Sequence, residues 1–131
     1  MLKKKKINIL KNNFLKNELI KKDLIRGCAN ITGGGLADNI KRIIPNNLCA
    51  EINLNKIKTL EIFRWLKKNG IKDNEMLKTF NCGVGFCIII NPKSLNNVIK
   101  YFPKEFKPYI IGKITNKKIK VKLNDKVSWF R

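Results

Sequence analysis

The residues most able to support chemistry are three consecutive glycines, residues 33–35, in the segment "NITGGGLADNI". Glycine loses more backbone freedom on folding than any other residue, so this run costs about 1–3 kcal/mol relative to alanines. Three requirements can offset that cost: a tight turn, close packing of a helix against a strand, or backbone N–H groups that receive an anion where the next helix begins. The residues alone leave all three open.

A second glycine segment, "TFNCGVG" at residues 79–85, leads into the apolar run "VGFCIIIN". That run is β-branched and lacks polar alternation, so it predicts a central strand buried on both faces. Ligands of sheet proteins tend to bind beside the ends of such strands. The two glycine segments together are therefore the candidate site.

Nucleophilic and metal chemistry find little support in the composition. The chain has no histidine, and its four cysteines, Cys28, Cys49, Cys82 and Cys87, include no C-x-x-C pair. We therefore expect no zinc site, no bound metal and no Cys-His or Ser-His pair. We expect reduced, mostly buried thiols in a cytoplasmic protein, with Cys82 packed or in a polar contact rather than acting as a nucleophile.

The charge of the chain raises nucleic acid or an acidic membrane surface as partners. The formal net charge is +20, from 29 Lys and Arg against nine Asp and Glu. Nearly all the basic residues are lysines and they occur in every segment, which is typical of solvated faces rather than of an arginine-rich recognition patch. We expect nucleic-acid binding, if any, to be non-specific. No run of 18 apolar residues exists, so we expect no membrane span.

The remaining sequence supplies the elements that must position the glycine segments. At 131 residues the chain fits one domain with its own core. Its start predicts a lysine-rich lead and then an amphipathic helix whose face holds Leu10, Phe14, Ile20, Leu24 and Ile25. Later patterns predict strands at 27–32, 49–54, 84–91, 109–114, 118–123 and 127–130.

Helices are expected between these strands. One follows the three glycines, one has Thr59 as its N-cap and ends at Gly70, a short one is capped by Asp73, and one opens at Pro92 and Ser94. Because helices and strands interleave irregularly, we expect an α+β fold, a layered α/β sandwich, rather than a Rossmann sheet.

Residues 29–131 closely resemble the C-terminal domain of phosphoribosylformylglycinamidine cyclo-ligase, also called aminoimidazole ribonucleotide synthetase, and residues 1–28 form a lysine-rich lead and helix outside that match. The motifs occur in order: "ITGGGLADNI", "RIIP", "IFRWL", "EMLKTFNCGVG" and "IIGKI". The glycine triplet alone is shared with related kinases and with selenium- or hydrogenase-maturation enzymes, so the combination of motifs carries the resemblance. It implies a mixed sheet.

The resemblance also implies a reaction. ATP would phosphorylate the amide oxygen of formylglycinamidine ribonucleotide to give an iminophosphate, and an amidine nitrogen would then expel phosphate and close the imidazole ring of purine biosynthesis. Mg²⁺ would bridge the nucleotide phosphates. Asn39 would either lend its amide to this site or be an ordinary exposed helix residue. The loops beside the substrate or phosphate would consist of Thr32, Gly33, Gly34 and Gly35, and of Asn81, Cys82, Gly83 and Gly85.

Two departures from the family pattern bear on activity. Family members usually carry histidine where this chain has Asn30, and asparagine cannot deliver a proton near neutral pH. The N-terminal domain that holds most of the nucleotide site has no counterpart here, so we expect a fragment, half of a split enzyme or a relic. Activity would then need a complementary ATP-binding half or a homodimer partner. The alternative is a non-catalytic basic protein that binds nucleic acid or an acidic partner.

Overall fold

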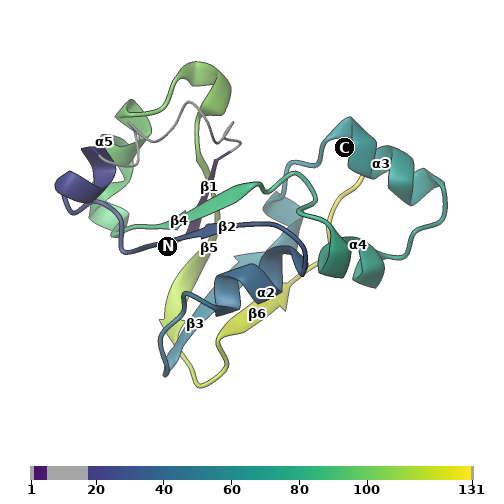
Figure 1. Cartoon of the computed structure of the whole chain (residues 1–131), viewed down its shortest axis with the longest axis horizontal. Coiled ribbons are helices and arrows are strands. Elements are labelled where there is room, and N and C mark those ends of the chain that lie inside the picture. The colour runs from purple at the N-terminus through teal and green to yellow at the C-terminus, as the bar shows by residue number, and fades with distance from the viewer. Residues whose placement is uncertain (1, 6–17, 131) are drawn as a thin grey trace.

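One six-stranded sheet organises the chain, in the strand order β2-β4-β1-β5-β3-β6 (Figure 1). The structure, a computed structural model, describes residues 2–5 and 18–130. The strands are β1 Leu2–Lys5, β2 Gly27–Asn30, β3 Leu48–Asn53, β4 Phe86–Ile89, β5 Tyr109–Asn116 and β6 Val121–Asn124. The helices are α2 Gly35–Lys41, α3 Glu61–Lys68, α4 Asp73–Thr79 and α5 Leu95–Lys100, with short 3-10 turns η2 Leu54–Lys56, η3 Pro92–Ser94 and η4 Lys104–Phe106.

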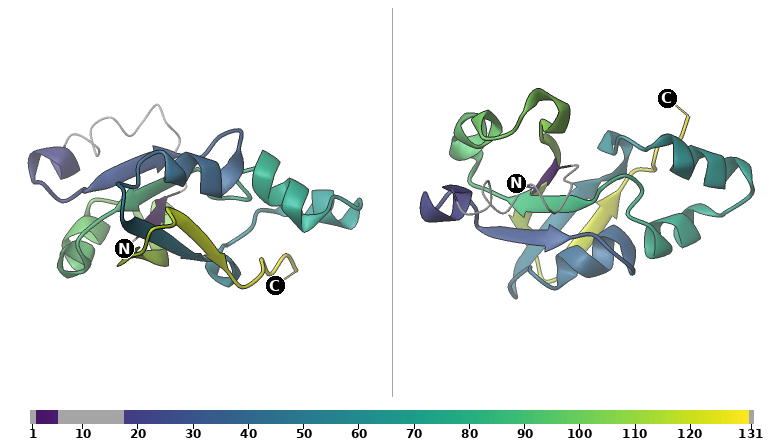
Figure 2. Two further views of the ribbon diagram at one scale, coloured as in Figure 1. Left: turned by 90° about the horizontal axis from the view of Figure 1, so that it is seen from below. Right: turned by 45° about the horizontal axis from the view of Figure 1, so that its top comes forward.

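The sheet is mixed, as expected. Neighbouring strands run antiparallel except for β3 and β6, which are parallel. The irregular order of helices and strands along the chain gives an α+β arrangement, and Figures 1 and 2 show α5 and the pair α3–α4 at opposite ends of the long axis with the sheet between them.

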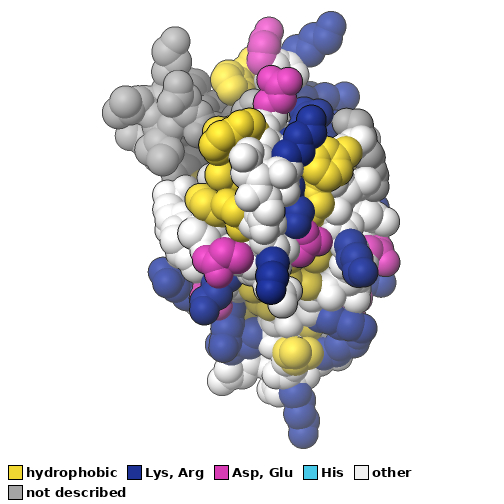
Figure 3. Space-filling view, turned by 90° about the vertical axis from the view of Figure 1, so that its right-hand side faces the viewer, with side chains coloured by type: hydrophobic (Ala, Val, Ile, Leu, Met, Phe, Trp, Pro, Cys, Tyr) yellow, Lys and Arg dark blue, Asp and Glu magenta, His cyan; other side chains and the backbone are white. Residues whose placement is uncertain are grey.

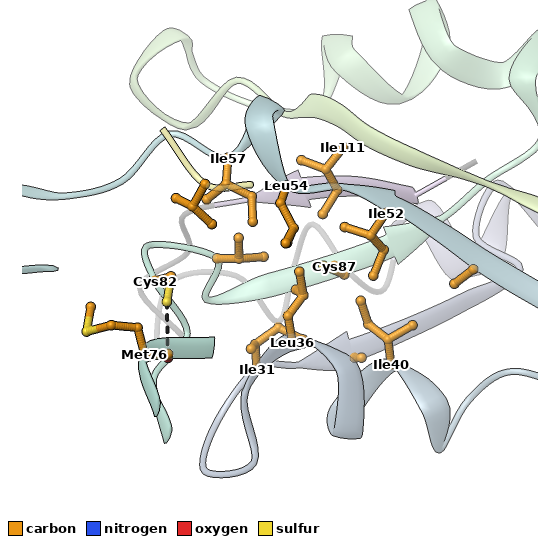
Figure 4. Close-up of a cluster of buried hydrophobic side chains, with 14 of the residues drawn as sticks. Ile31, Leu36, Ile40, Ile52, Leu54, Ile57, Met76, Cys82, Cys87 and Ile111 are labelled. Carbon is orange, nitrogen blue, oxygen red and sulfur yellow. Dashed lines mark hydrogen bonds between the residues drawn. The ribbon is translucent and has the colours of Figure 1, made fainter. Parts of the chain in front are cut away.

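Strand β4 lies inside the sheet, paired with β2 on one side and β1 on the other, which confirms the central strand predicted from its apolar run. Its side chains alternate between two cores because successive residues of a strand point to opposite faces. Cys87 joins the larger cluster under α2, shown in Figure 4, whereas Phe86 and Ile88 join a smaller cluster with α5. The sheet is thus covered on both faces, as a layered sandwich requires.

Helix α2 packs on the sheet through the face that its apolar spacing predicts. Leu36 and Ile40 are buried in the larger cluster, with Ile44 beyond the helix end. Helix α5 follows η3 as the Pro92 and Ser94 signal indicates, and it buries Val98 in the smaller cluster. The buried faces of α2 and α5 match those predicted from sequence because the apolar stripe of each helix packs against a face of the sheet.

Four sequence-based expectations are wrong. Thr59 does not cap α3, whose N-cap position is Leu60, and Asp73 is the first residue of α4 rather than its cap. Residues 127–130 form no strand: residues 129–130 are a turn, and the Trp129 side chain is buried with its Nε1 donating to Asp73 Oδ1 at 3.0 Å. Ile20 does not share the buried face of its helix, because it is 59% exposed while Leu19 is buried.

The lysine-rich lead includes a strand that composition did not indicate. Leu2–Lys5 forms β1 between β4 and β5, where backbone pairing on both sides decides its conformation. The expected helix survives at residues 18–21, and its positions Leu10 and Phe14 lie outside the described residues. Leu24 and Ile25 pack against the smaller cluster as expected.

Candidate functional site

The two glycine segments lie side by side at one end of the sheet. The first, residues 32–35, follows β2, and the second, residues 81–85, precedes β4. Since β2 and β4 are antiparallel neighbours, the end of one meets the start of the other. The Ile31 N–H donates to the Gly85 carbonyl oxygen at 3.0 Å, which joins the two loops directly.

The first loop is a tight turn. The Gly35 N–H donates to the Thr32 carbonyl oxygen at 3.0 Å, and Gly34 has φ 92° and ψ −10°. These values match the third position of a type II turn, where a positive φ favours glycine. The turn accounts for one of the three glycines.

The other two glycines serve different purposes. A Cβ on Gly35 would lie 1.8 Å from the carbonyl oxygen of Leu77 in α4, so this position is required for close packing of α2 on α4. A Cβ on Gly33 would meet nothing within 4 Å. The turn and the packing requirements therefore both hold, and Gly33 remains as the glycine whose backbone a ligand can approach.

The side-chain amide of Asn39 holds the first loop in place by hydrogen bonds to its carbonyl oxygens. Its side chain is buried, and its Nδ2 donates to the carbonyl oxygens of Gly35 at 2.7 Å, Gly33 at 3.2 Å and Thr32 at 3.3 Å. Its Oδ1 accepts from Thr32 Oγ1 at 3.4 Å. The alternative of an ordinary exposed helix residue is therefore wrong. The loop carbonyls are thus bound by Asn39, while the Gly33 and Gly34 N–H groups have no acceptor among residues 18–130.

The second loop is a type I′ turn. The Val84 N–H donates to the Asn81 carbonyl oxygen at 2.7 Å, and both central residues have positive φ, 51° for Cys82 and 91° for Gly83. The Asn81 Oδ1 accepts from the Gly83 N–H at 2.9 Å and so stabilises the turn. A Cβ added at Gly85, like one added at Gly33, would have no neighbouring atom within 4 Å. Each loop thus carries one glycine with open space beside it.

The Cys82 thiol faces the core. It is buried, and its Sγ donates to the Met76 carbonyl oxygen at 3.2 Å, the contact drawn as a dashed line in Figure 4. This contact agrees with the packed or polar-contact role predicted from sequence. Cys82 therefore contributes to the loop through its backbone conformation at the turn and not through an accessible sulfur.

Asn30, at the position of the family histidine, lies at the end of β2. It pairs with Phe86 and its side chain is exposed. Asn30 directly precedes Ile31, whose N–H bonds to Gly85, and it is part of neither turn.

No metal cluster is found among the described residues. They contain no group of three or more His, Cys, Asp or Glu placed to hold an ion. In the part of the chain that the structure describes, no helix is long and apolar enough to cross a membrane. Lysine and arginine side chains are scattered over the face seen in Figure 3 and do not gather into one patch on that face.

Comparison with known proteins sets this geometry in a family. Residues 6–124 match the sequence model described as "AIR synthase related protein, C-terminal domain". The chain belongs to this family. AIR synthase-related domains occur in several enzymes, so the match identifies the domain and not one reaction.

Solved structures agree with the fold of the AIR synthase-related domain. T. maritima PurL complexed with FGAR superposes with a TM-score of 0.58 at 13% sequence identity, covering 85% of this chain and 17% of that chain. T. maritima PurL complexed with AMPPCP gives a TM-score of 0.56 at 13% identity, covering 79% of this chain and 17% of that chain. The chain therefore spans about a sixth of the length of these proteins.

Sequence reasoning found both loops and missed what holds them together. The backbone contact between Gly35 and Leu77 left no composition signal, because a carbonyl oxygen is present at every residue. The bond between Ile31 and Gly85 could have been inferred from pairing β2 with β4, a topology that the sequence pattern did not specify.

Proposed function

We propose that this chain is the C-terminal part of an ATP-dependent cyclo-ligase that closes the imidazole ring of aminoimidazole ribonucleotide from formylglycinamidine ribonucleotide. The observation that carries the proposal is the contact of the two glycine loops, through the 3.0 Å bond from Ile31 to Gly85, in an AIR synthase-related domain. Each loop has an open glycine, Gly33 or Gly85, where a ligand can approach the backbone.

The chain's own part in this reaction is to bind and orient. The N–H groups of Gly33 and Gly34 are the donors that would meet an anionic oxygen, and Asn39 fixes their direction by holding the carbonyls of the same loop. Donors fixed before the reaction stabilise developing negative charge without reorganising, so a loop of this kind suits charge stabilisation rather than nucleophilic attack. The buried Cys82 thiol takes no part.

ATP would supply the phosphoryl group that activates the amide oxygen. The free N–H groups of the first loop fit a phosphate or a phosphorylated substrate, but the described residues offer no acidic cluster for Mg²⁺. We therefore infer that a complementary ATP-binding domain, joined to this chain or separate, holds the metal and most of the nucleotide. PurL complexed with AMPPCP, an ATP analogue, is consistent with nucleotide binding elsewhere in such proteins.

The test combines this chain with the ATP-binding domain of an aminoimidazole ribonucleotide synthetase and measures ATP-dependent ring closure by mass spectrometry. We expect no product from the chain alone and product from the mixture. Gly33→Val should abolish it, whereas Gly27→Ala, a glycine change in β2 with only ordinary contacts from 3.4 Å, should not. Product from the chain alone, or full activity of Gly33→Val, would contradict the proposal.

The alternative of a non-catalytic basic binding protein is not favoured. The family match covers most of the chain, and no residue cluster described here points to nucleic acid. Binding to a duplex that is sequence-selective and persists at high salt would reverse this preference, because scattered lysines give only salt-sensitive, non-specific binding.

A further inference from the structure

We propose that the outer side of α3 docks an acidic segment of another protein that carries large apolar side chains. This surface, the α3 face, consists of Ile62, Arg64, Trp65 and Lys68 together with Phe130. Three of these residues belong to "IFRWL", the motif at residues 62–66 that the glycine loops do not use. Binding at the α3 face goes beyond the proposed reaction and does not depend on it.

Helix α3 carries apolar side chains on two sides. Phe63 and Leu66 pack against the larger core cluster, as an amphipathic helix requires. Ile62 and Trp65, three residues apart and therefore neighbours on the helix surface, are 55% and 58% exposed. The core thus accounts for one side of the helix and leaves a second apolar side in contact with solvent.

Phe130 extends this surface beyond the helix. Its side chain is 61% exposed, and the Lys68 ammonium lies 5.9 Å from the centre of its ring. Figure 3 views the end of the molecule where α3 and α4 lie in Figure 1, and hydrophobic side chains reach the surface there among basic ones. Apolar side chains gathered on a folded surface mark sites that bind another molecule.

A cavity on the α3 face can receive a side chain of the partner. Its volume is about 450 Å³, and its walls are formed by Glu61, Ile62, Arg64, Trp65 and Lys68. The indole ring, the isoleucine and the apolar stems of the arginine and lysine suit a large apolar side chain. Tryptophan and arginine are also the residues that most often dominate the binding energy of protein interfaces.

Charge selects an acidic partner. Arg64 and Lys68 take part in none of the ion pairs among the described residues, and the Nε of Arg64 is buried there without a hydrogen-bond partner. Glu61 is the one acidic residue in the cavity wall. Carboxylates bind guanidinium and ammonium groups through charge-assisted hydrogen bonds. Acidic side chains beside the apolar ones would therefore supply the negative charge that this surface lacks.

Three other occupants fit the α3 face less well. A second copy in a symmetric contact would place Arg64 and Lys68 against the same residues, in chains that each carry a net charge of +20. Single-stranded nucleic acid would stack on Trp65, but Glu61 repels phosphate and Ile62 offers no planar face. A bilayer surface presents no projecting side chain to fill the cavity.

The primary test titrates a helical peptide of about 16 residues, with leucine on one side and glutamate on the other, into the full 131-residue chain by calorimetry. Ile62→Ser with Trp65→Ser should weaken binding at least about tenfold. The matched control is Ile20→Ser with Ile119→Ser, 59% and 58% exposed outside the α3 face, and it should change affinity less than about twofold. No binding to the unaltered chain, or equal weakening by both pairs, would overturn the proposal.

A second set of variants tests the charges. Arg64→Gln with Lys68→Gln should weaken the glutamate–leucine peptide about tenfold and reduce the dependence of its affinity on salt. Lys118→Gln with Lys122→Gln, exposed residues in and after the β5–β6 turn, should change affinity less than about twofold. A peptide with serine in place of leucine should bind about tenfold more weakly. Equal affinity of the two peptides would reduce the binding to general charge attraction and contradict the proposal.

Further measurements compare the other occupants. Oligouridylate and vesicles of phosphatidylcholine with phosphatidylserine are titrated into the unaltered chain and into Ile62→Ser with Trp65→Ser, and we expect the two proteins to bind each probe equally. Binding of either probe that only the unaltered chain shows would assign the α3 face to nucleic acid or to a membrane instead. Sedimentation should detect no dimer that Trp65→Ser dissociates, and such a dimer would assign the face to a second copy.

Discussion

Gly35 and Leu77 approach so closely that a Cβ on Gly35 would lie 1.8 Å from the Leu77 carbonyl oxygen. Gly35 also has φ +68°, where a side chain is strained. We expect Gly35→Ala to lower the free energy of unfolding by more than about 3 kcal/mol, or to prevent folding, because α2 and α4 must separate. Urea unfolding measures the change; a loss below about 1 kcal/mol would show that the contact can relax.

Gly33 is the position that separates ligand approach from folding. Its added Cβ meets nothing within 4 Å, so Gly33→Val should leave the melting temperature nearly unchanged while weakening the binding of phosphorylated substrate in the assembled enzyme. Gly34→Val cannot make this distinction, because Gly34 has φ +92° and its Cβ would lie 3.1 Å from that of Asp38. Unchanged ligand affinity in well-folded Gly33→Val would remove the first loop from the site.

Asn39 should act through the loop it holds. Asn39→Leu removes the donor shared by three carbonyl oxygens, and we expect a loss of about 1–3 kcal/mol in the free energy of unfolding together with faster amide exchange at Gly35, whose N–H closes the turn by donating to the Thr32 carbonyl oxygen. Asn96→Leu, on the exposed face of α5, is the matched control and should change stability little. Unchanged exchange in Asn39→Leu would mean that the turn is stable without the amide.

Stability should depend on pH through Glu51. The hydrogen bond from Lys117 lowers the pKa of the Glu51 carboxyl below its usual 4.5, so the folded state favours the charged form. This contribution is present above pH 4.5 and is lost as the pH falls through the lower folded-state pKa. Glu51→Gln should therefore make the melting temperature less dependent on pH between about pH 5 and 3. Glu105→Gln, which removes a carboxylate without an ion pair in the described residues, should not.

The fluorescence of the two tryptophans should respond differently to an added quencher. Trp65 is 58% exposed on α3, whereas Trp129 is 6% exposed and donates to Asp73. We expect Trp65→Phe to remove most of the acrylamide-quenchable fluorescence, and Trp129→Phe to leave it in place. Equal quenching of the two single-tryptophan proteins would show that the contact between Trp129 and Asp73 opens in solution.

The sequence specified local features better than contacts across the fold. The apolar spacing of Leu36 and Ile40 predicted the buried face of α2, and the β-branched run at Ile88–Ile90 predicted an interior strand, because both signals come from neighbouring residues. The Thr59 cap and the strand at 127–130 were wrong for the opposite reason. Trp129 is fixed by Asp73, 56 residues away, and no local pattern records such a partner.

The sequence identified the residues of the candidate site but not which glycine meets which structural requirement. The glycine triplet left turn, packing and ligand approach open, and the structure assigns the first to Gly34 and the second to Gly35. Only backbone angles and neighbouring atoms can make that division, since the three residues are chemically identical. Asn39 was ambiguous for a related reason, because its burial depends on how the loop folds back over α2.

The place of β1 in the sheet has a consequence for how the molecule is made. β1 is the strand that joins β2–β4 to β5–β3–β6, so neither part of the sheet meets the other without it. Leu2–Lys5 leaves the ribosome long before its partners, Phe86–Ile89 and Tyr109–Asn116, have been synthesised. The nascent chain must therefore keep this segment unpaired until nearly all of the domain has emerged, which delays completion of the sheet and exposes its edges to other chains in the meantime.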